Sequence, residues 1–289
     1  GYGRLTHPLV YDRASDTLRP VAWEQAFARI GEILRGLQPD EVEFYTSGRA
    51  SNEAAWLFQL YAREYGTNNF PDCSNMCHEA TSVGLPRSIG IGKGTVSLDD
   101  FDKTELVISI GHNPGTNHPR MMGTLHELAR RNVPIIVFNP LRERALERFA
   151  DPQSVIEMAT YGSTDIASTY FQVKAGGDAA ALKGIAKHLL EMEAERGDVL
   201  DRAFIAEHTQ GFEDFAADIA QTRWDEIERE SGLSQAALKK VAEAYAKSNA
   251  TIITYGMGIT QHNKGTANVR LIADLLLMRG NIGKPGAGI

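Results

Sequence analysis

The stretch Cys73-Ser-Asn-Met-Cys77-His78 holds both cysteines of the chain, and an imidazole directly follows the second thiol. A thiolate is both a nucleophile and a metal ligand, and a neighbouring imidazole can take up or return a proton. Glycines are frequent around this stretch, from Gly48 to Gly94. These residue types suit either of two tasks, binding a metal or attacking a substrate.

Three interpretations of this stretch stay open from the residues alone. A structural zinc site needs four ligands and a cubane iron–sulfur cluster needs four thiolates, whereas Cys73, Cys77 and His78 offer three groups. A Cys–His nucleophile is possible, but adjacency in sequence does not place the imidazole nitrogen on the sulfur. The third interpretation is a cysteine that packs as a small hydrophobic residue.

Arg270 is a further candidate, near the start of a helix predicted over 264–279. Its planar guanidinium can grip a small carboxylate through two parallel hydrogen bonds. The alternative is an arginine that faces solvent or caps a neighbouring helix end.

Composition and charge limit the classes of function. A net charge of −7 at pH 7 argues against a general nucleic-acid binder. No apolar run is long enough to span a bilayer, so we expect no membrane segment. Two cysteines cannot form a disulfide framework, which indicates a reducing compartment, the cytoplasm. The chain has no initiator Met and stops in a glycine-rich loop, so we expect a fragment of a longer protein.

Strand-like and helix-like segments alternate along the chain. Apolar residues at helical spacing predict a helix over 20–34, and a cap at Ser51 or Asn52 predicts one over 52–65. Pro119 suits the first turn of a helix over 119–131, and further helices are expected over 178–190 and 264–279, with several more between 197 and 248. Alternating or continuous apolar runs predict strands over 41–46, 105–110, 134–139, 171–174 and 251–255. Continuous apolar strands are typical of buried parallel sheets. The pattern therefore predicts an α/β fold with a parallel sheet.

Three glycine turns, at 111–117, 176–178 and 256–261, each follow a predicted strand and precede a helix. In open α/β sheets, ligands bind outside the carboxyl ends of strands, where helix N-termini attract phosphate. None of the turns is a G-x-G-x-x-G motif or a P-loop, and a single such turn is usually structural. Three turns on one sheet edge favour a nucleotide-like ligand, to which nearby side chains can add hydrogen bonds: Asn113, Asn117, Asn139 and Asp178.

The order of these motifs resembles the molybdopterin oxidoreductases, and most of all the formate dehydrogenase-like alpha subunits of the dimethyl-sulfoxide reductase superfamily. The motifs are Cys-x-x-x-Cys-His at 73–78, Gly-x-Gly-x-Gly at 90–94, Gly-His-Asn-Pro at 111–114, Asn-Pro at 139–140, Gly-Gly-Asp at 176–178, Gly-Met-Gly-Ile-Thr-Gln at 256–261 and Gly-Asn-Ile-Gly-x-Pro-Gly-Ala-Gly at 280–288. The resemblance covers essentially the whole chain, and its last two motifs are the most specific.

The resemblance implies a bis(molybdopterin guanine dinucleotide) cofactor that carries molybdenum or tungsten. It implies that Cys77 is the protein ligand of the metal and that Arg270 holds the carboxylate of formate. His78 would then accept the proton or orient the substrate. In the family, a 4Fe-4S cluster lies in an N-terminal segment and a C-terminal domain closes over the cofactor, and both are expected outside this chain.

The resemblance also places the nucleotide halves of the cofactor on four segments. The cofactor-binding residues that it implies are Gly111, His112, Asn113, Asn117, His118, Asn139, Pro140, Gly176, Gly177, Asp178, Gly256, Met257, Gly258, Thr260 and Gln261. One departure concerns 139–141, where relatives often have Asp-Pro-Arg and this chain has Asn-Pro-Leu. A neutral asparagine can still bond to ribose hydroxyls.

The family architecture implies two central α/β domains, each with a mostly parallel sheet flanked by helices. We expect a discontinuous domain of 1–72 and 271–289 around an inserted cofactor-binding domain, 73–270. The implied function is the two-electron oxidation of a small anionic substrate such as formate, with an electron-transfer partner that the sequence does not name and no activity in the fragment alone. Two alternatives remain: a non-catalytic scaffold of the complex I large iron–sulfur subunit type, and a simple nucleotide-binding α/β protein.

Overall fold

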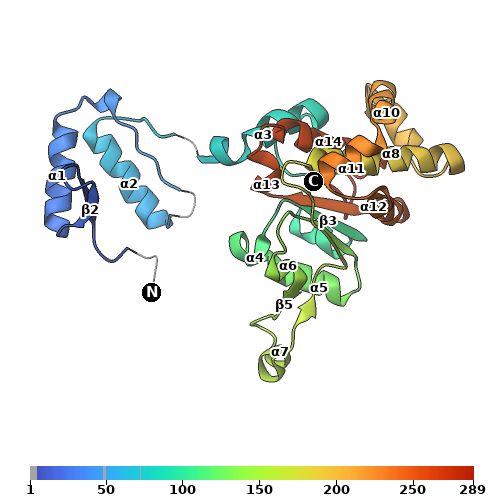
Figure 1. Ribbon diagram of the computed structural model, residues 1–289, viewed down its shortest axis with the longest axis horizontal. Coiled ribbons are helices and arrows are strands. Elements are labelled where there is room, and N and C mark those ends of the chain that lie inside the picture. The colour runs from blue at the N-terminus through green and yellow to red at the C-terminus, as the bar shows by residue number, and fades with distance from the viewer. Residues whose placement is uncertain (1–4, 48–49, 72) are drawn as a thin grey trace. The chain divides into compact units, whose positions relative to one another are not determined.

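The computed structural model of the chain describes residues 5–47, 50–71 and 73–289, with the backbone alone for 73–75. By its internal contacts the chain divides into two compact units, 1–74 and 75–289. Figure 1 labels the helices and strands of both units. Within the described ranges, every helix is too short or too polar to cross a bilayer.

The first unit contains a β-hairpin and two helices. Strand β1 (Leu9–Asp12) pairs antiparallel with β2 (Thr17–Pro20), and helices α1 (Trp23–Arg35) and α2 (Asn52–Tyr65) follow, with a short 3-10 turn η1 (Pro39–Glu41) between them. The Ser51 hydroxyl caps α2 by accepting a hydrogen bond from the backbone N–H of Ala54, and Gly66 ends the helix with a φ of 106°. Both helices were predicted, α1 from the spacing of its apolar residues and α2 from a cap at Ser51 or Asn52.

The strand predicted over 41–46 is wrong. Glu41 belongs to η1, and 42–47 is irregular. Among the described residues, this segment is tied to the loop after α2 by the backbone N–H of Phe44, which donates to the carbonyl of Asn69, and by the Asn69 side chain, which donates to the carbonyl of Val42. A strand needs a repeating ladder of such backbone bonds, so the apolar alternation alone is not enough.

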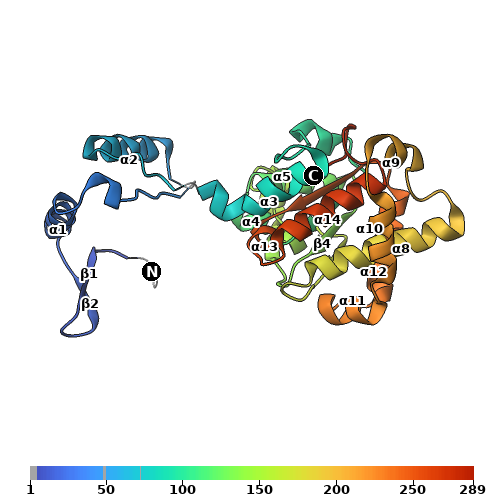
Figure 2. The same cartoon turned by 90° about the horizontal axis from the view of Figure 1, so that it is seen from above.

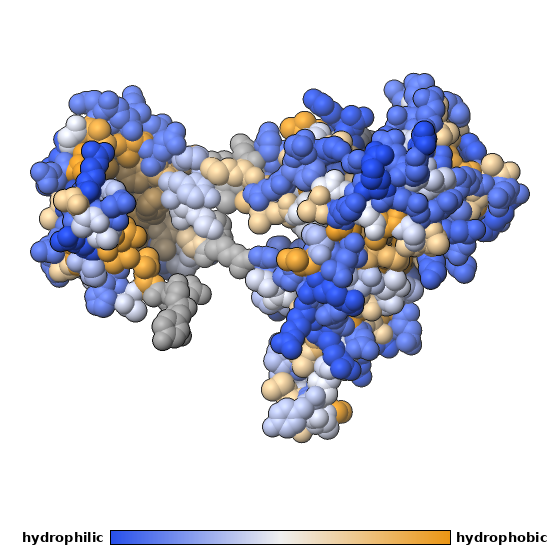
Figure 3. Space-filling model, in the orientation of Figure 1, coloured by the Kyte–Doolittle hydropathy of each residue, from blue (hydrophilic) through white to orange (hydrophobic). Residues whose placement is uncertain are grey.

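An apolar surface is exposed on the first unit and appears orange in Figure 3. The helices α1 and α2 bury little: Trp23, Phe27, Trp56 and Leu57 are each 58 to 63% exposed. The small core is a cluster of rings around Phe44. Contiguous exposed apolar surface of this kind is typical of a face that another segment covers.

The second unit is built on a four-stranded sheet in the order β7-β4-β3-β8. The strands are β3 (Leu106–Ile110), β4 (Ile135–Phe138), β7 (Thr169–Phe171) and β8 (Thr251–Tyr255), and every neighbouring pair is parallel. The predicted α/β class and parallel sheet are confirmed. The strand expected over 171–174 lies slightly earlier in the chain.

Helices cover both faces of this sheet, as Figure 1 shows. On one face, Ile108 and Ile110 pack in the larger core with α8 (Asp178–Arg196), α12 (Gln235–Lys247) and α14 (Gly265–Met278). On the other face, Val107 packs in a smaller core against α5 (Met121–Arg130). Three helices complete the larger core: α9 (Arg202–His208), α10 (Phe212–Gln221) and α11 (Trp224–Ser231).

The strand order reverses direction between β3 and β8. From β3 the chain moves outward through β4 to β7, and then returns to add β8 on the other side of β3. The helix after β3 covers one face of the sheet and the helix after β8 covers the other. Such a reversal opens a crevice at the carboxyl ends of the two strands, which is where open α/β sheets bind ligands.

The end of the chain packs on the second unit. Gly288 forms a parallel bridge with Ile252, and the carbonyl of Ile289 accepts a hydrogen bond of 2.8 Å from the N–H of Thr95. The grouping of 1–72 with 271–289 in one discontinuous domain around 73–270 stays a prediction.

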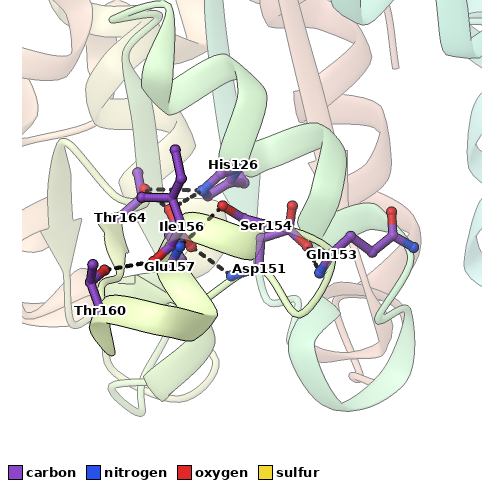
Figure 4. Close-up of polar contacts among 8 residues, drawn as sticks. All are labelled: His126, Asp151, Gln153, Ser154, Ile156, Glu157, Thr160 and Thr164. Atoms are coloured by element: carbon purple, nitrogen blue, oxygen red, sulfur yellow. Dashed lines mark hydrogen bonds and ion pairs between the residues drawn. The ribbon is translucent and has the colours of Figure 1, made fainter.

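A projecting arm, absent from the sequence-based prediction, extends over 148–165. It consists of β5 (Arg148–Phe149), α7 (Val155–Thr160) and β6 (Thr164–Asp165). Figure 4 shows how it is fastened to α5: the Glu157 carboxylate accepts a hydrogen bond from the ring of His126 (2.8 Å). The same carboxylate ties the arm together internally by accepting from the backbone N–H of Asp151 (2.7 Å). These bonds hold the pKa of Glu157 down, at about 2, with the Asp151 bond as the largest cause.

Candidate functional site

Cys77 and His78 lie within a helix, α3 (Cys73–Ile89), which is kinked at His78. His78 has φ −132° and ψ 25°, well away from helical values. Both side chains are half-buried. The side chain of Cys73 lies outside the described part of the chain, so the candidate thiol that can be placed is that of Cys77.

Helix α3 packs closely on α14, and the two run side by side in Figure 2. A Cβ atom on Gly84 would lie 3.1 Å from Cγ1 of Val269, and one on Gly265 would lie 3.1 Å from Cβ of Ala80. The small residues therefore permit the close approach of the two helices. This packing brings the Cys77 turn to the sheet edge from which α14 begins.

The Cys77 turn is bonded directly to the glycine turn after β8. The Thr260 hydroxyl donates a hydrogen bond of 2.7 Å to the carbonyl of Cys77, and the Gln261 amide nitrogen donates one of 3.3 Å to the carbonyl of Met76. Thr260 is the last residue of α13 (Met257–Thr260) and is buried. Two predicted site segments that are far apart in sequence thus meet in space.

The turns after β3 and β8 also contact each other. The N–H of Gly258 donates a hydrogen bond of 3.1 Å to the carbonyl of Gly111, and the N–H of Gly256 donates one of 3.3 Å to the carbonyl of Ile110. A Cβ atom on Gly258 would lie 2.8 Å from the Gly111 oxygen, and Gly111 has a φ of 56°. Glycine is required here because a side chain would force the turns apart.

Two imidazoles form a pair beside these turns. Nε2 of His112 lies 2.9 Å from Nδ1 of His118, and His112 is 7% exposed. Burial, and secondarily the neighbouring His118, lower the pKa of His112 to about 4. The Asn139 side chain donates to the carbonyl of His112 across 3.2 Å. At neutral pH the buried ring is therefore uncharged.

His78 belongs to the same edge of the sheet. Its Nδ1 lies 3.4 Å from the Thr81 hydroxyl, which in turn lies 2.8 Å from the hydroxyl of Tyr255 at the end of β8. Burial, with a smaller contribution from His118, lowers the pKa of His78. Tyr255 pairs in the sheet with Ile110, the last residue of β3, so the Thr81–Tyr255 bond brings His78 to the strand ends from which His112 also follows.

The predicted asparagines are engaged in local structure. Asn113 caps the short helix α4 (Pro114–Asn117) by accepting from the N–H of Thr116, and its amide donates 2.7 Å to the Glu143 carboxylate. The Asn117 amide donates to the carbonyl of Asn113. Beside them, the carbonyl of Pro140 accepts a hydrogen bond from Gln172. A contact between these side chains and a nucleotide stays a prediction.

The third glycine turn reaches the same region through His262, which the sequence-based prediction missed. A Cβ atom on Gly176 would lie 2.7 Å from Nε2 of His262, and Gly176 has a φ of 83°. Nδ1 of His262 accepts the N–H of Lys264 (3.0 Å), so the neutral ring carries its proton on Nε2, the atom nearest Gly176. The signal available in the sequence was the position of His262 directly after the 256–261 motif.

Gly177 and Asp178 lie at the start of α8, on the inner side of this third turn. A Cβ atom on Gly177 would lie 2.5 Å from the carbonyl of Glu230, so glycine is required there. Asp178 is buried, and this burial raises the pKa of its carboxyl against the weaker opposing effects of its own backbone N–H and of His262.

Arg270 is the predicted site residue that the structure does not join to the others. It is exposed on α14, and its charge acts on Asp274, one turn later on the same helix. Burial raises the pKa of Asp274 to about 6, and Arg270 opposes that rise. Among the described residues, Arg270 has no hydrogen bond to Cys77 or His78.

Buried polar atoms without partners gather at this edge. In the described part of the chain, six buried side-chain nitrogen or oxygen atoms have no hydrogen-bond partner, and four of them belong to residues on β3, β8, the turn after β3 and the start of α14: Ser109, Thr254, His112 and Asn268. Unpaired buried polar atoms are costly, and native proteins usually satisfy them. Their concentration fits a polar ligand, whereas no group of three or more His, Cys, Asp or Glu among the described residues could hold a metal unaided.

These features define an α/β protein with a polar site at the switch point of its parallel sheet. A model of the molybdopterin oxidoreductase family matches residues 4–289, and the chain belongs to that family. It is 58% identical to Protein YdeP of Escherichia coli (strain K12) over 293 aligned residues, which cover 99% of this chain and 39% of that protein. It is 29% identical to formate dehydrogenase H of the same organism, over 99% of this chain and 38% of that protein.

A solved structure with the same fold is that of acetylene hydratase from Pelobacter acetylenicus. The TM-score is 0.65 at 18% identity, over 100% of this chain and 37% of that chain. The chain thus spans well under half the length of the relatives it matches. At this identity the likeness concerns the fold, and it agrees with the parallel sheet flanked by helices.

Proposed function

We propose that the chain is the cofactor-cradling part of a molybdenum or tungsten oxidoreductase that is formate dehydrogenase-like and oxidises a small anion by two electrons. The observation that carries the proposal is the meeting of three segments at one sheet edge. The turn after β8 bonds to the Cys77 turn through Thr260 and to the turn after β3 through Gly258. The backbone of Cys77, the candidate whose side chain is described, thus meets the edge of the sheet where the family would hold its cofactor.

The residues at this edge fit a bis(molybdopterin guanine dinucleotide). Phosphates and ribose hydroxyls need polar partners and a close approach to the backbone. The glycine turns would permit the approach, and the buried polar atoms without partners would supply hydrogen bonds. The buried Asp178 carboxylate is an acceptor for the N–H groups of a base such as guanine. The cofactor would supply the electron-accepting metal centre, which protein side chains cannot provide.

The remaining roles fall on residues of this chain. Cys77 would be the thiolate ligand of the metal, since soft thiolates suit such metals. His78, adjacent to it and partly buried, would orient the substrate or take up its proton. Arg270 would hold the carboxylate of the substrate. Its exposed position on α14 leaves the guanidinium accessible to an incoming anion.

Metal analysis of the full-length protein tests this proposal. After expression with molybdate or tungstate, we expect close to one metal atom per protein, loss of the metal in Cys77→Ala, and retention in the matched thiol control Cys73→Ala. A protein that folds but carries neither metal would refute the proposal and favour a non-catalytic scaffold. A screen of formate and similar anions with an artificial electron acceptor would then identify the substrate.

A further inference from the structure

Thr260 and Gln261 were expected to bind the cofactor, but the structure commits both side chains to another contact. Thr260 donates to the carbonyl of Cys77 and Gln261 to the carbonyl of Met76. The two donors are consecutive, and so are the two acceptors. A two-point attachment of this kind fixes both the position and the rotation of the turn that it holds.

The kink at His78 explains why the turn needs an outside anchor. A φ of −132° turns the peptide planes out of the helical arrangement at this residue. Backbone carbonyls near a helix irregularity are commonly satisfied by side chains of another segment. Here the acceptors are the carbonyls of Met76 and Cys77, the residues just before the kink.

The donor segment is itself fixed to the sheet. Gly256 and Gly258 donate to the carbonyls of Ile110 and Gly111, at the end of β3. Thr260 is 7% exposed, so loss of its hydroxyl would leave the Cys77 carbonyl short of a buried donor. The start of α14 closes over it, since a Cβ atom on Gly265 would lie 2.4 Å from the Thr260 carbonyl.

We infer that Thr260 is a positioning residue: its hydroxyl, aided by Gln261, sets the place of the Cys77 sulfur relative to the glycine turns. We call these two bonds the Cys77 clamp. The clamp deepens the proposed function, because it gives the thiolate a fixed position toward a metal without contact between Thr260 and the metal. Groups outside the ligand shell that orient a ligand typically change metal affinity or activity by about 10- to 100-fold.

The test compares Thr260→Val, which keeps the shape and removes the hydroxyl, with Thr260→Ser, which keeps the hydroxyl. Thr104→Val is the matched control, because Thr104 is also buried and also donates to backbone carbonyls, those of Leu106 and Ala250, at the opposite end of β3. All variants are made in the full-length protein.

The first readout is the rate at which iodoacetamide alkylates Cys77 in the cofactor-free protein, followed by mass spectrometry of the peptide. Because the loss of one buried hydrogen bond favours local opening, we expect Thr260→Val to raise the rate about tenfold, and Thr260→Ser and Thr104→Val to stay within about twofold of the wild type. Equal rates in Thr260→Val and wild type would overturn the inference. A rate raised as much by Thr104→Val would overturn it as well, because general loosening would then be the cause.

The second readout is the electron paramagnetic resonance spectrum of the metal in the loaded protein. A displaced thiolate changes the signal, and the serine variant restores it if the hydroxyl is responsible. If the wild type binds no metal, the proposed function is refuted. The alkylation rates still test whether the Cys77 clamp positions the sulfur.

Discussion

The rings of His112 and His118 share a hydrogen bond of 2.9 Å at the point where the sheet reverses its strand order. The other ring nitrogen of His112, Nδ1, is buried and has no hydrogen-bond partner among the described residues. A hydrogen bond between two imidazoles needs one ring to donate and the other to accept. A second proton on His112 is opposed both by burial and by its neighbour. The ring of His112 is therefore kept neutral at one of the glycine turns, which suits a polar contact without fixed charge at this position.

His112 makes the second unit sensitive to acid. Its folded-state pKa of about 4 lies below the usual 6.5, so the unfolded state binds the extra proton more readily. The stability that neutral His112 contributes is therefore fully present above pH 6.5 and is lost as the pH falls toward 4. The free energy of unfolding drops by at most about 3 kcal/mol. We expect His112→Gln to remove part of this loss. The loss of stability is measured by hydrogen exchange of the β3 amides at pH 7 and pH 4.5. A variant with the same pH dependence as the wild type would contradict the prediction.

Asp178→Asn separates the stability of the fold from ligand binding. Burial raises the pKa of the Asp178 carboxyl, so the folded state binds its proton more tightly than the unfolded state does. The protein therefore loses stability as the pH rises, first through the pKa that Asp178 has in the unfolded state and then through its pKa in the folded state. At pH 7 the neutral asparagine is therefore expected to raise the melting temperature of the cofactor-free protein, with a smaller gain at pH 4. In the loaded protein, the same change is expected to lower cofactor retention. A variant that melts lower at pH 7 would show that the carboxylate stabilises the fold instead.

Gly258→Ala tests the contact between the two glycine turns. The new Cβ atom would lie 2.8 Å from the carbonyl oxygen of Gly111, and neither backbone can yield easily. We expect a loss of about 1–3 kcal/mol in the free energy of unfolding, measured with urea. The matched control is Gly123→Ala in α5, where nothing lies within 4 Å of the added atom. That change is expected to stabilise the protein by up to about 1 kcal/mol, because glycine is a poor helix former.

The sequence predicted most of the second unit because its strands and helices have strong patterns. Buried parallel strands read as continuous apolar runs, and β3, β4 and β8 lie where those runs are. Helix α3 was not predicted, since Gly84 and Pro86 interrupt it and its apolar residues do not keep to one side. The arm over 148–165 was missed because its elements are only two to six residues long.

The candidate site could be predicted only as separate motifs. The strand order that places the turn after β8 beside the turn after β3 is a tertiary property, since nothing local to 251–255 says which strand it joins. The bond from Thr260 to Cys77 joins residues 183 positions apart. His262 and Arg270 show both limits. His262 lies at the site although the predicted motifs stop one residue before it. Arg270 was a predicted site residue, but it is exposed on α14, and the described part of the chain shows no hydrogen bond that joins it to the site.

Glu157→Gln tests the fastening of the projecting arm. Glutamine keeps the size of the side chain but weakens the acceptor that now binds the Asp151 N–H and the His126 ring. The pKa of Glu157 is lowered from its ordinary value of 4.5 to about 2. The stability that its carboxylate contributes is therefore present above pH 4.5 and is lost as the pH falls through 2. At pH 7 we expect faster hydrogen exchange across 148–165, with β3 and β8 unchanged. Glu127→Gln, at an exposed position next to His126, is the control, and equal exchange in both variants would mean that the carboxylate does not hold the arm.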